Sequence, residues 1–164
     1  MGSLIIENAN LFIGVDEGVI ANGAVWVSDG VIKFSGAVSD LPAGGENIER
    51  YDALGKFVMP GMTESHVHLS YNNSHPKQLN SEPLPIAMLD AVDNARILLG
   101  SGFTSAISFG SAQGLDVPLR DAINAGRIPG PRLAASDRDL GSTGSNADGT
   151  FGGDSSKKII ADGP

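Results

Sequence analysis

The sequence contains no cysteine, which excludes disulfide bonds and thiolate metal sites from this chain. Basic residues are also scarce: 11 Lys and Arg stand against 19 Asp and Glu, giving a net charge of −8. They form no basic run, so nucleic acids and anionic membranes are poor candidates for partners. Acidity of this size mainly favours solubility.

Targeting signals and long apolar runs are missing as well. The first basic residue is Lys33, so the N-terminal segment lacks the positively charged region of a secretory signal peptide. No apolar stretch approaches the roughly 20 residues that span a bilayer. We therefore expect a cytoplasmic globular protein, and 164 residues suffice for one domain or somewhat more.

The N-terminal third is typical of short strands joined by tight turns. Asn22-Gly23 and Asp29-Gly30 are dipeptides that favour two-residue turns with positive φ. Apolar stretches at residues 24–28 and 31–35 flank the second dipeptide, which predicts a β-hairpin there. Further short strands are expected at residues 4–6 and 48–52.

From Lys56 onward the pattern changes to alternating strands and helices. Strands are predicted at residues 62–69, 103–109 and 131–136, with helices at 84–99 and 116–125 between them. This order is typical of parallel βα units and indicates an α/β fold.

Two details of these helices are specific enough to test. In the first helix, the helical spacing of Ile86, Leu89, Val92 and Leu99 predicts that they share the buried face. In the second, Asp116 is expected to cap the N-terminus.

The C-terminal part is rich in loop-forming residues. Residues 141–156 have almost no apolar content and predict either a long loop at the catalytic end of a barrel or a disordered segment. The final Asp162-Gly163-Pro164 has the composition of a helix start.

His66 and His68 are the strongest candidates for chemistry. They lie two positions apart at the end of a predicted strand, so their imidazoles project from the same side. Two neighbouring imidazoles can chelate one divalent metal ion. A His-x-His pair alone is a weak signal, since surface or structural histidines show the same spacing by chance.

The surrounding sequence makes the signal specific. Residues 55–68 (GKFVMPGMTESHVH) resemble the first-strand signature of the amidohydrolase superfamily, and residues 102–105 and 119–133 resemble its imidazolonepropionase- and prolidase-like branch. The resemblance implies a small β-sandwich segment at residues 1–55. It also implies that residues 56–164 are the first three βα units of a (β/α)₈ TIM barrel, which is incomplete in this chain.

The resemblance also implies the function. Members hydrolyse C–N bonds, here of a small amide or dipeptide-like substrate, through water activated by one or two divalent metal ions, usually zinc. His66 and His68 match the first-strand ligands, and the remaining ligands and catalytic residues are expected beyond Pro164. A deaminase of the same superfamily and a catalytically inert fragment are the alternatives, and a homo-oligomer is left open.

Substrate contacts are expected from Tyr71 and Asn72, just after the histidine pair, and from Asn146, where the branch often carries a histidine. Two further departures from the family pattern bear on substrate and efficiency. Glu64 replaces a usual aspartate, and Ser108-Phe109 stands where Arg-Asp is common.

A complete barrel needs roughly 250 residues, so we expect the fourth-strand ligand to be absent. The alternative makes Lys157 or Lys158 that ligand on a strand at residues 159–160, but no helical pattern precedes it to form the crossover.

We predict that the purified 164-residue chain, standing alone, does not hydrolyse amides, because two histidines hold a catalytic metal too loosely. Turnover of amide substrates that is lost on adding a chelator would contradict this prediction.

Overall fold

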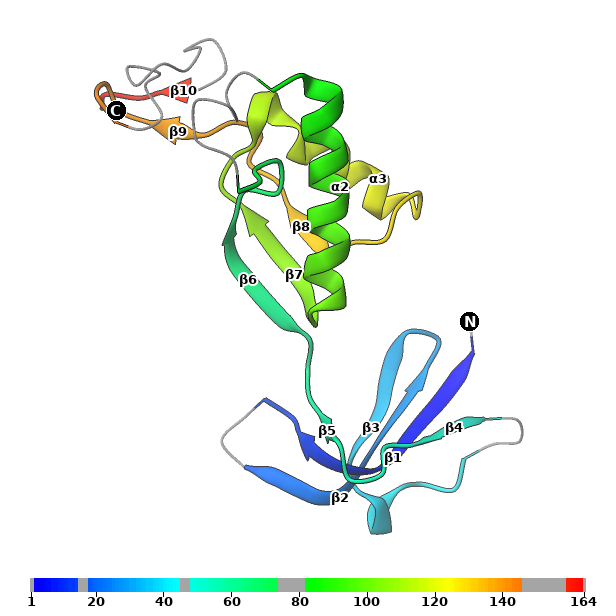
Figure 1. Ribbon diagram of the computed structural model, residues 1–164. Helices are drawn as coiled ribbons and strands as arrows, with labels where there is room; N and C mark the ends of the chain where they lie inside the picture. The colour runs from blue at the N-terminus through cyan, green and yellow to red at the C-terminus, as the bar shows by residue number, and fades with distance from the viewer. Residues whose placement is uncertain (1, 15–17, 45–47, 74–81, 146–158, 164) are drawn as a thin grey trace. The chain divides into compact units, whose positions relative to one another are not determined.

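The computed structural model describes residues 2–14, 18–44, 48–73, 82–145 and 159–163 (Figure 1). The chain divides into two compact units, Met1–Pro60 and Gly61–Pro164. Within the described residues no helix is long and apolar enough to cross a membrane.

The elements found among the described residues of the first unit are strands and one short 3₁₀ turn. Its described residues form a single five-stranded sheet in the order β3-β2-β1-β4, with β5 also paired to β1. β1 is antiparallel to β2 and parallel to β4 and β5. A second sheet, which a sandwich requires, is not seen in this part of the described chain, so the sandwich stays a prediction. The elements are β1 (Ser3–Phe12), β2 (Val19–Ser28), β3 (Val31–Ala37), η1 (Val38–Asp40), β4 (Glu49–Asp52) and β5 (Phe57–Val58).

The predicted hairpin is confirmed, and its turn has the expected backbone. β2 and β3 pair antiparallel around Asp29 and Gly30, whose φ angles are 53° and 79°. Asn22-Gly23, by contrast, was expected to turn the chain but lies inside β2 at an irregularity of the ladder. Gly23 is needed there because an added Cβ would lie 2.5 Å from Leu11 Cβ on the neighbouring strand.

The boundary between the units falls after Pro60 rather than after Gly55. Phe57 and Val58 pair in parallel with Asn10 and Leu11 of β1, so the backbone ladder of the first sheet extends past the predicted boundary.

The second unit is built on a three-stranded sheet, β6-β7-β8, in which every pair is parallel. Helices α2 and α3 connect these strands (Figure 1), and side chains of both helices and of the strands form one core. The core is formed by Leu69, Ala91, Ala95, Ala106, Leu119 and Leu133. The elements are β6 (Met62–Val67), α2 (Leu84–Gly100), β7 (Phe103–Ser108), η2 (Ala112–Gly114), α3 (Asp116–Asn124) and β8 (Arg132–Ala134).

The parallel βα order is therefore as predicted, but the buried face of α2 is only partly so: Val92 packs against the core as expected, and Ile86 and Leu89 do not. Ala87, Ala91 and Ala95 are buried, whereas Ile86 and Leu89 are 46% and 62% exposed. Small side chains let the helix backbone lie close to the sheet, and bulky ones at those positions would hold it away.

The last described residues form a separate two-stranded sheet, in which β9 (Leu140–Gly141) pairs in parallel with β10 (Ile159–Ile160). β10 therefore does not add a fourth strand beside β8, against the alternative weighed from the sequence. Asp162 and Gly163 are not helical; the Asp162 carboxylate accepts hydrogen bonds from the Thr143 backbone N–H at 2.7 Å and hydroxyl at 2.6 Å.

We expect Ala91→Leu to destabilise the protein by about 1–3 kcal/mol, because the larger side chain overpacks the contact between α2 and the sheet. The control Leu89→Ala, at an exposed position of the same helix, should change stability by less than about 0.5 kcal/mol. Urea unfolding followed by circular dichroism measures both. Equal effects of the two substitutions would contradict this orientation of α2.

Candidate active site

The candidate site lies at the carboxyl ends of the three parallel strands. In the β6–β7 ladder Val67 pairs with Ser108, and the Phe109 N–H donates to the Val67 carbonyl at 3.1 Å. In the β7–β8 ladder Ile107 pairs with Ala134, so the loops after all three strands begin at one edge of the sheet.

His66 and His68 lie together at this edge. Their Nε2 atoms are 3.2 Å apart, and their ring centroids are 5.2 Å apart with the planes inclined by 64°. Val67, between them, packs against the core on the other side of the strand. The period-2 alternation of a strand thus gives the pair its common direction.

The distance between the two Nε2 atoms fits a shared divalent metal. Two nitrogens at the usual 2.0–2.1 Å from one zinc ion, separated by 3.2 Å, subtend about 100°, close to a tetrahedral angle. The same distance also fits a hydrogen bond between the two imidazoles. Among the described residues no group of three or more His, Asp or Glu side chains gathers around a metal position.

His68 is the more strongly held of the two rings. Its Nδ1 lies 3.0 Å from the Gly110 carbonyl oxygen and 3.5 Å from Oδ1 of Asp139. Gly110 has φ +123°, and an added Cβ would overlap the Asp139 backbone. Glycine is therefore required for the loops after β7 and β8 to meet beside His68.

His66 is exposed and held differently. Its ring stacks on Phe109, with centroids 4.4 Å apart and planes inclined by only 8°. Its backbone N–H donates to Oε1 of Glu64 at 3.3 Å. The two departures from the family pattern at Glu64 and Phe109 thus both contact His66.

Of the three predicted substrate contacts, Tyr71 lies at the site. Its ring stacks on His68 with centroids 5.2 Å apart, and its hydroxyl donates to Oδ2 of Asp139 at 2.9 Å. Burial of the ring, followed by the negative charge of Asp139, raises the pKa of Tyr71 above its usual 10.0. The hydroxyl therefore stays protonated and remains a donor.

Asn72 contacts α2 and the residues just before it. Its Nδ2 donates to Asp90 of α2 at 2.7 Å and lies 3.5 Å from Glu82. Asn146, the third predicted contact, lies outside the described residues, as do Lys157 and Lys158.

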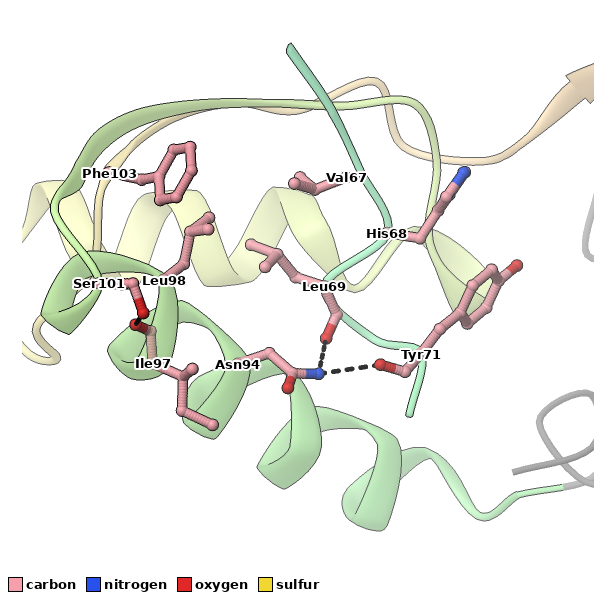
Figure 2. A pocket seen from close by; sticks show the side chains of 9 residues that line it. All are labelled: Val67, His68, Leu69, Tyr71, Asn94, Ile97, Leu98, Ser101 and Phe103. Atoms are coloured by element: carbon pink, nitrogen blue, oxygen red, sulfur yellow. Dashed lines mark hydrogen bonds between the residues drawn. The ribbon is translucent and has the colours of Figure 1, made fainter. Parts of the chain in front are cut away.

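A pocket of about 350 Å³ borders the site on the side of α2 (Figure 2). His68 and Tyr71 lie at one end of it, and Leu98 and Phe103 at the other. Asn94 of α2 donates from Nδ2 to the carbonyls of Leu69 and Tyr71, at 2.9 Å each. This side chain, which sequence reasoning missed, ties the segment after β6 to the helix; its only sequence signal is one amide beside the alanines of the buried face.

Asp116 is a second residue whose role the sequence did not predict. It lies in the first turn of α3 at 1% exposure; Leu115 occupies the cap position, without a side-chain hydrogen bond. The Asp116 carboxylate accepts hydrogen bonds from the Ser111 hydroxyl at 3.0 Å and the Ser136 N–H at 3.1 Å. It therefore joins the loops after β7 and β8.

Comparison with solved structures gives the class of fold. An amidohydrolase crystal structure superposes with a TM-score of 0.77 at 29% identity, covering 89% of this chain and 34% of its own. A prolidase complexed with N-methylphosphonate-L-proline superposes with a TM-score of 0.81 at 25% identity, covering 98% and 41%. The fold is thus mixed α/β and similar to the amidohydrolase fold.

Comparison of sequences finds similarity to imidazolonepropionases. The chain is similar to the imidazolonepropionase of Bradyrhizobium sp. strain BTAi1, with 44% identity over 54 residues, or 33% of this chain and 13% of the relative. It is 31% identical over 90 residues to that of Bacillus cereus, covering 55% of this chain and 20% of the relative. No family model matches the chain.

Together these findings support the assignment of this chain to the amidohydrolase superfamily. They confirm the resemblance predicted from the sequence. Members of this superfamily generally use a divalent metal. The matches span 13% and 20% of the two curated relatives' length, and 34% and 41% of the two solved chains.

We expect Asp116→Ala to destabilise the protein by about 1–3 kcal/mol, because it removes a buried carboxylate that accepts hydrogen bonds from the Ser136 N–H and the Ser111 hydroxyl. Asp121→Ala, which removes a side chain that is 62% exposed from the same helix, is the control. Both are measured by urea unfolding. A loss no larger than that of the control would show that Asp116 does not join the two loops.

Proposed function

We propose that this chain carries the first metal ligands of an amidohydrolase that hydrolyses a C–N bond in a small amide or dipeptide-like substrate. The observation that carries the proposal is the 3.2 Å separation of His66 Nε2 and His68 Nε2 at the carboxyl end of the first parallel strand. Relatives named imidazolonepropionase and prolidase support the choice of bond.

The proposed fold and cofactor follow from the same likeness. Residues 61–164 form the first three βα units of a (β/α)₈ barrel, and the first unit belongs to a β-sandwich. One or two divalent ions, zinc by preference, occupy the site, since imidazole nitrogens suit zinc. When bound, the ion acidifies water and polarises the carbonyl under attack.

In this proposal the residues of the chain bind the metal ion, orient the His68 ring and shape the space for the substrate. His66 and His68 contribute Nε2 lone pairs, and the Gly110 carbonyl fixes the His68 ring through Nδ1. Phe109, 50% exposed and stacked on His66, forms an apolar wall beside the pair. Such a wall excludes water from one side of the site and favours substrates with an apolar group next to the scissile bond.

The proposal is tested first by metal binding to the chain itself. Zn²⁺ titrated against a chromophoric chelator should bind wild-type protein, and His66→Ala or His68→Ala should each weaken binding at least about tenfold, because one of two ligands is lost. His75→Ala, which removes the third histidine of the chain, is the matched control. Equal Zn²⁺ affinity of all four proteins would refute the assignment.

Activity is tested on the natural gene product that contains this sequence, with a panel of dipeptides, N-acyl amino acids and ring amides. We expect chelator-sensitive amide cleavage that is lost in His66→Ala and His68→Ala. Release of ammonia from a ring amine with no amide cleavage would favour the deaminase alternative.

A further inference from the structure

Asp139 approaches the proposed metal ligands from a distant part of the sequence. It immediately precedes β9, and its Oδ1 lies 3.5 Å from His68 Nδ1. Within the described part of the chain this Oδ1 is buried and has no hydrogen-bond partner. A buried carboxylate oxygen without a hydrogen bond is costly, and a proton on His68 Nδ1, 3.5 Å away, lowers that cost by electrostatic attraction.

The other carboxylate oxygen is held by Tyr71. The Tyr71 hydroxyl donates to Asp139 Oδ2 at 2.9 Å, and the Tyr71 ring stacks on His68. Each of the side chains of His68, Asp139 and Tyr71 therefore contacts the other two. The raised pKa of Tyr71 keeps the hydroxyl available as a donor.

We propose that Asp139, held by Tyr71, is a positioning residue that fixes the orientation and tautomer of His68, so that Nε2 is free to bind a metal. The inference rests on the proposed function in one respect, namely that His68 is a metal ligand. The observation beneath it is geometric: two acceptors, the Gly110 carbonyl and Asp139 Oδ1, both face Nδ1. A proton on Nδ1 donates to the Gly110 carbonyl and is attracted by the Asp139 carboxylate, so it stays on Nδ1 and leaves a lone pair on Nε2.

This arrangement makes the two histidines unequal. With the proton of His68 on Nδ1, its Nε2 can only accept, so in the metal-free chain the 3.2 Å contact requires His66 to donate from its own Nε2. The His66 ring stacks on Phe109, and the Glu64 carboxylate binds the backbone N–H of His66 rather than its ring, so neither contact fixes the ring proton. The metal-free chain should therefore contain His68 as the Nδ1–H tautomer and His66 as the Nε2–H tautomer.

The test compares two substitutions that remove the same charge two residues apart. Asp139→Asn removes the carboxylate beside His68, and Asp137→Asn removes one that is half exposed and lies 3.9 Å from Arg138. Tyr71→Phe removes the hydroxyl that holds Asp139. Long-range ¹H–¹⁵N spectra of the metal-free chain in mildly alkaline solution report the tautomer of each imidazole, and competition with a chromophoric chelator gives the Zn²⁺ affinity.

We expect wild-type protein and Asp137→Asn to show a single His68 tautomer with the proton on Nδ1, and Asp139→Asn to show a mixture. Zn²⁺ affinity should fall about tenfold or more in Asp139→Asn, as for other substitutions behind a metal-binding histidine, and less in Tyr71→Phe. Far-UV circular dichroism of each variant checks folding. If Asp139→Asn fails to fold, a tautomer mixture in Tyr71→Phe supports the inference and an unchanged His68 tautomer overturns it.

The proposal is overturned if Asp139→Asn matches Asp137→Asn in tautomer and in Zn²⁺ affinity. Failure of the proposed function is a different result, in which wild-type protein shows no Zn²⁺ binding that depends on His66 and His68. In that case the tautomer spectra alone decide whether Asp139 positions His68.

Discussion

The parallel pairing of β6, β7 and β8 is the constraint on which the second unit depends. Because all three strands run the same way, the loops that follow them begin at one edge and must share its space. His68, Gly110 and Asp139 each come from a different one of these loops, and they meet within 3.5 Å. The backbone hydrogen bonds of the sheet thus bring residues together that are far apart in the sequence. Asp116 also joins the second and third loops, through its hydrogen bonds to Ser111 and Ser136.

The sequence predicted the parts of this arrangement that depend on short-range periodicity. His66 and His68 project together because strand side chains alternate, and the Asp29-Gly30 hairpin forms because its dipeptide tolerates positive φ. The order of helices and strands in the second unit was also predictable, because a Gly or Pro lies close to at least one end of each helix and each strand from β6 to β8. The substrate contacts expected of Tyr71, Asn72 and Asn146 stay predictions.

What the sequence did not predict depends on tertiary packing. Their hydrophobicity led us to place Ile86 and Leu89 on the buried face of α2. The alanines are buried instead, because their small side chains let the helix lie close to the sheet. Aspartate is a common helix-capping residue, but the buried Asp116 carboxylate accepts a hydrogen bond from the Ser136 N–H instead. The position of Asp139 just after the third strand could not predict its partners, because His68 and Tyr71 lie about 70 positions earlier.

The alanine-lined contact of α2 also affects how this protein behaves at high concentration. With its alanines inside, the helix presents Ile86, Leu89 and Ile97 to water, at 46%, 62% and 65% exposure. Stripes of this kind promote adhesion between molecules, more so in sulfate or phosphate salts that strengthen apolar burial. The opposing force is the mutual repulsion of chains with a net charge of −8, which salt also screens. Dilute, low-salt buffer is therefore the condition in which the chain is least prone to aggregate.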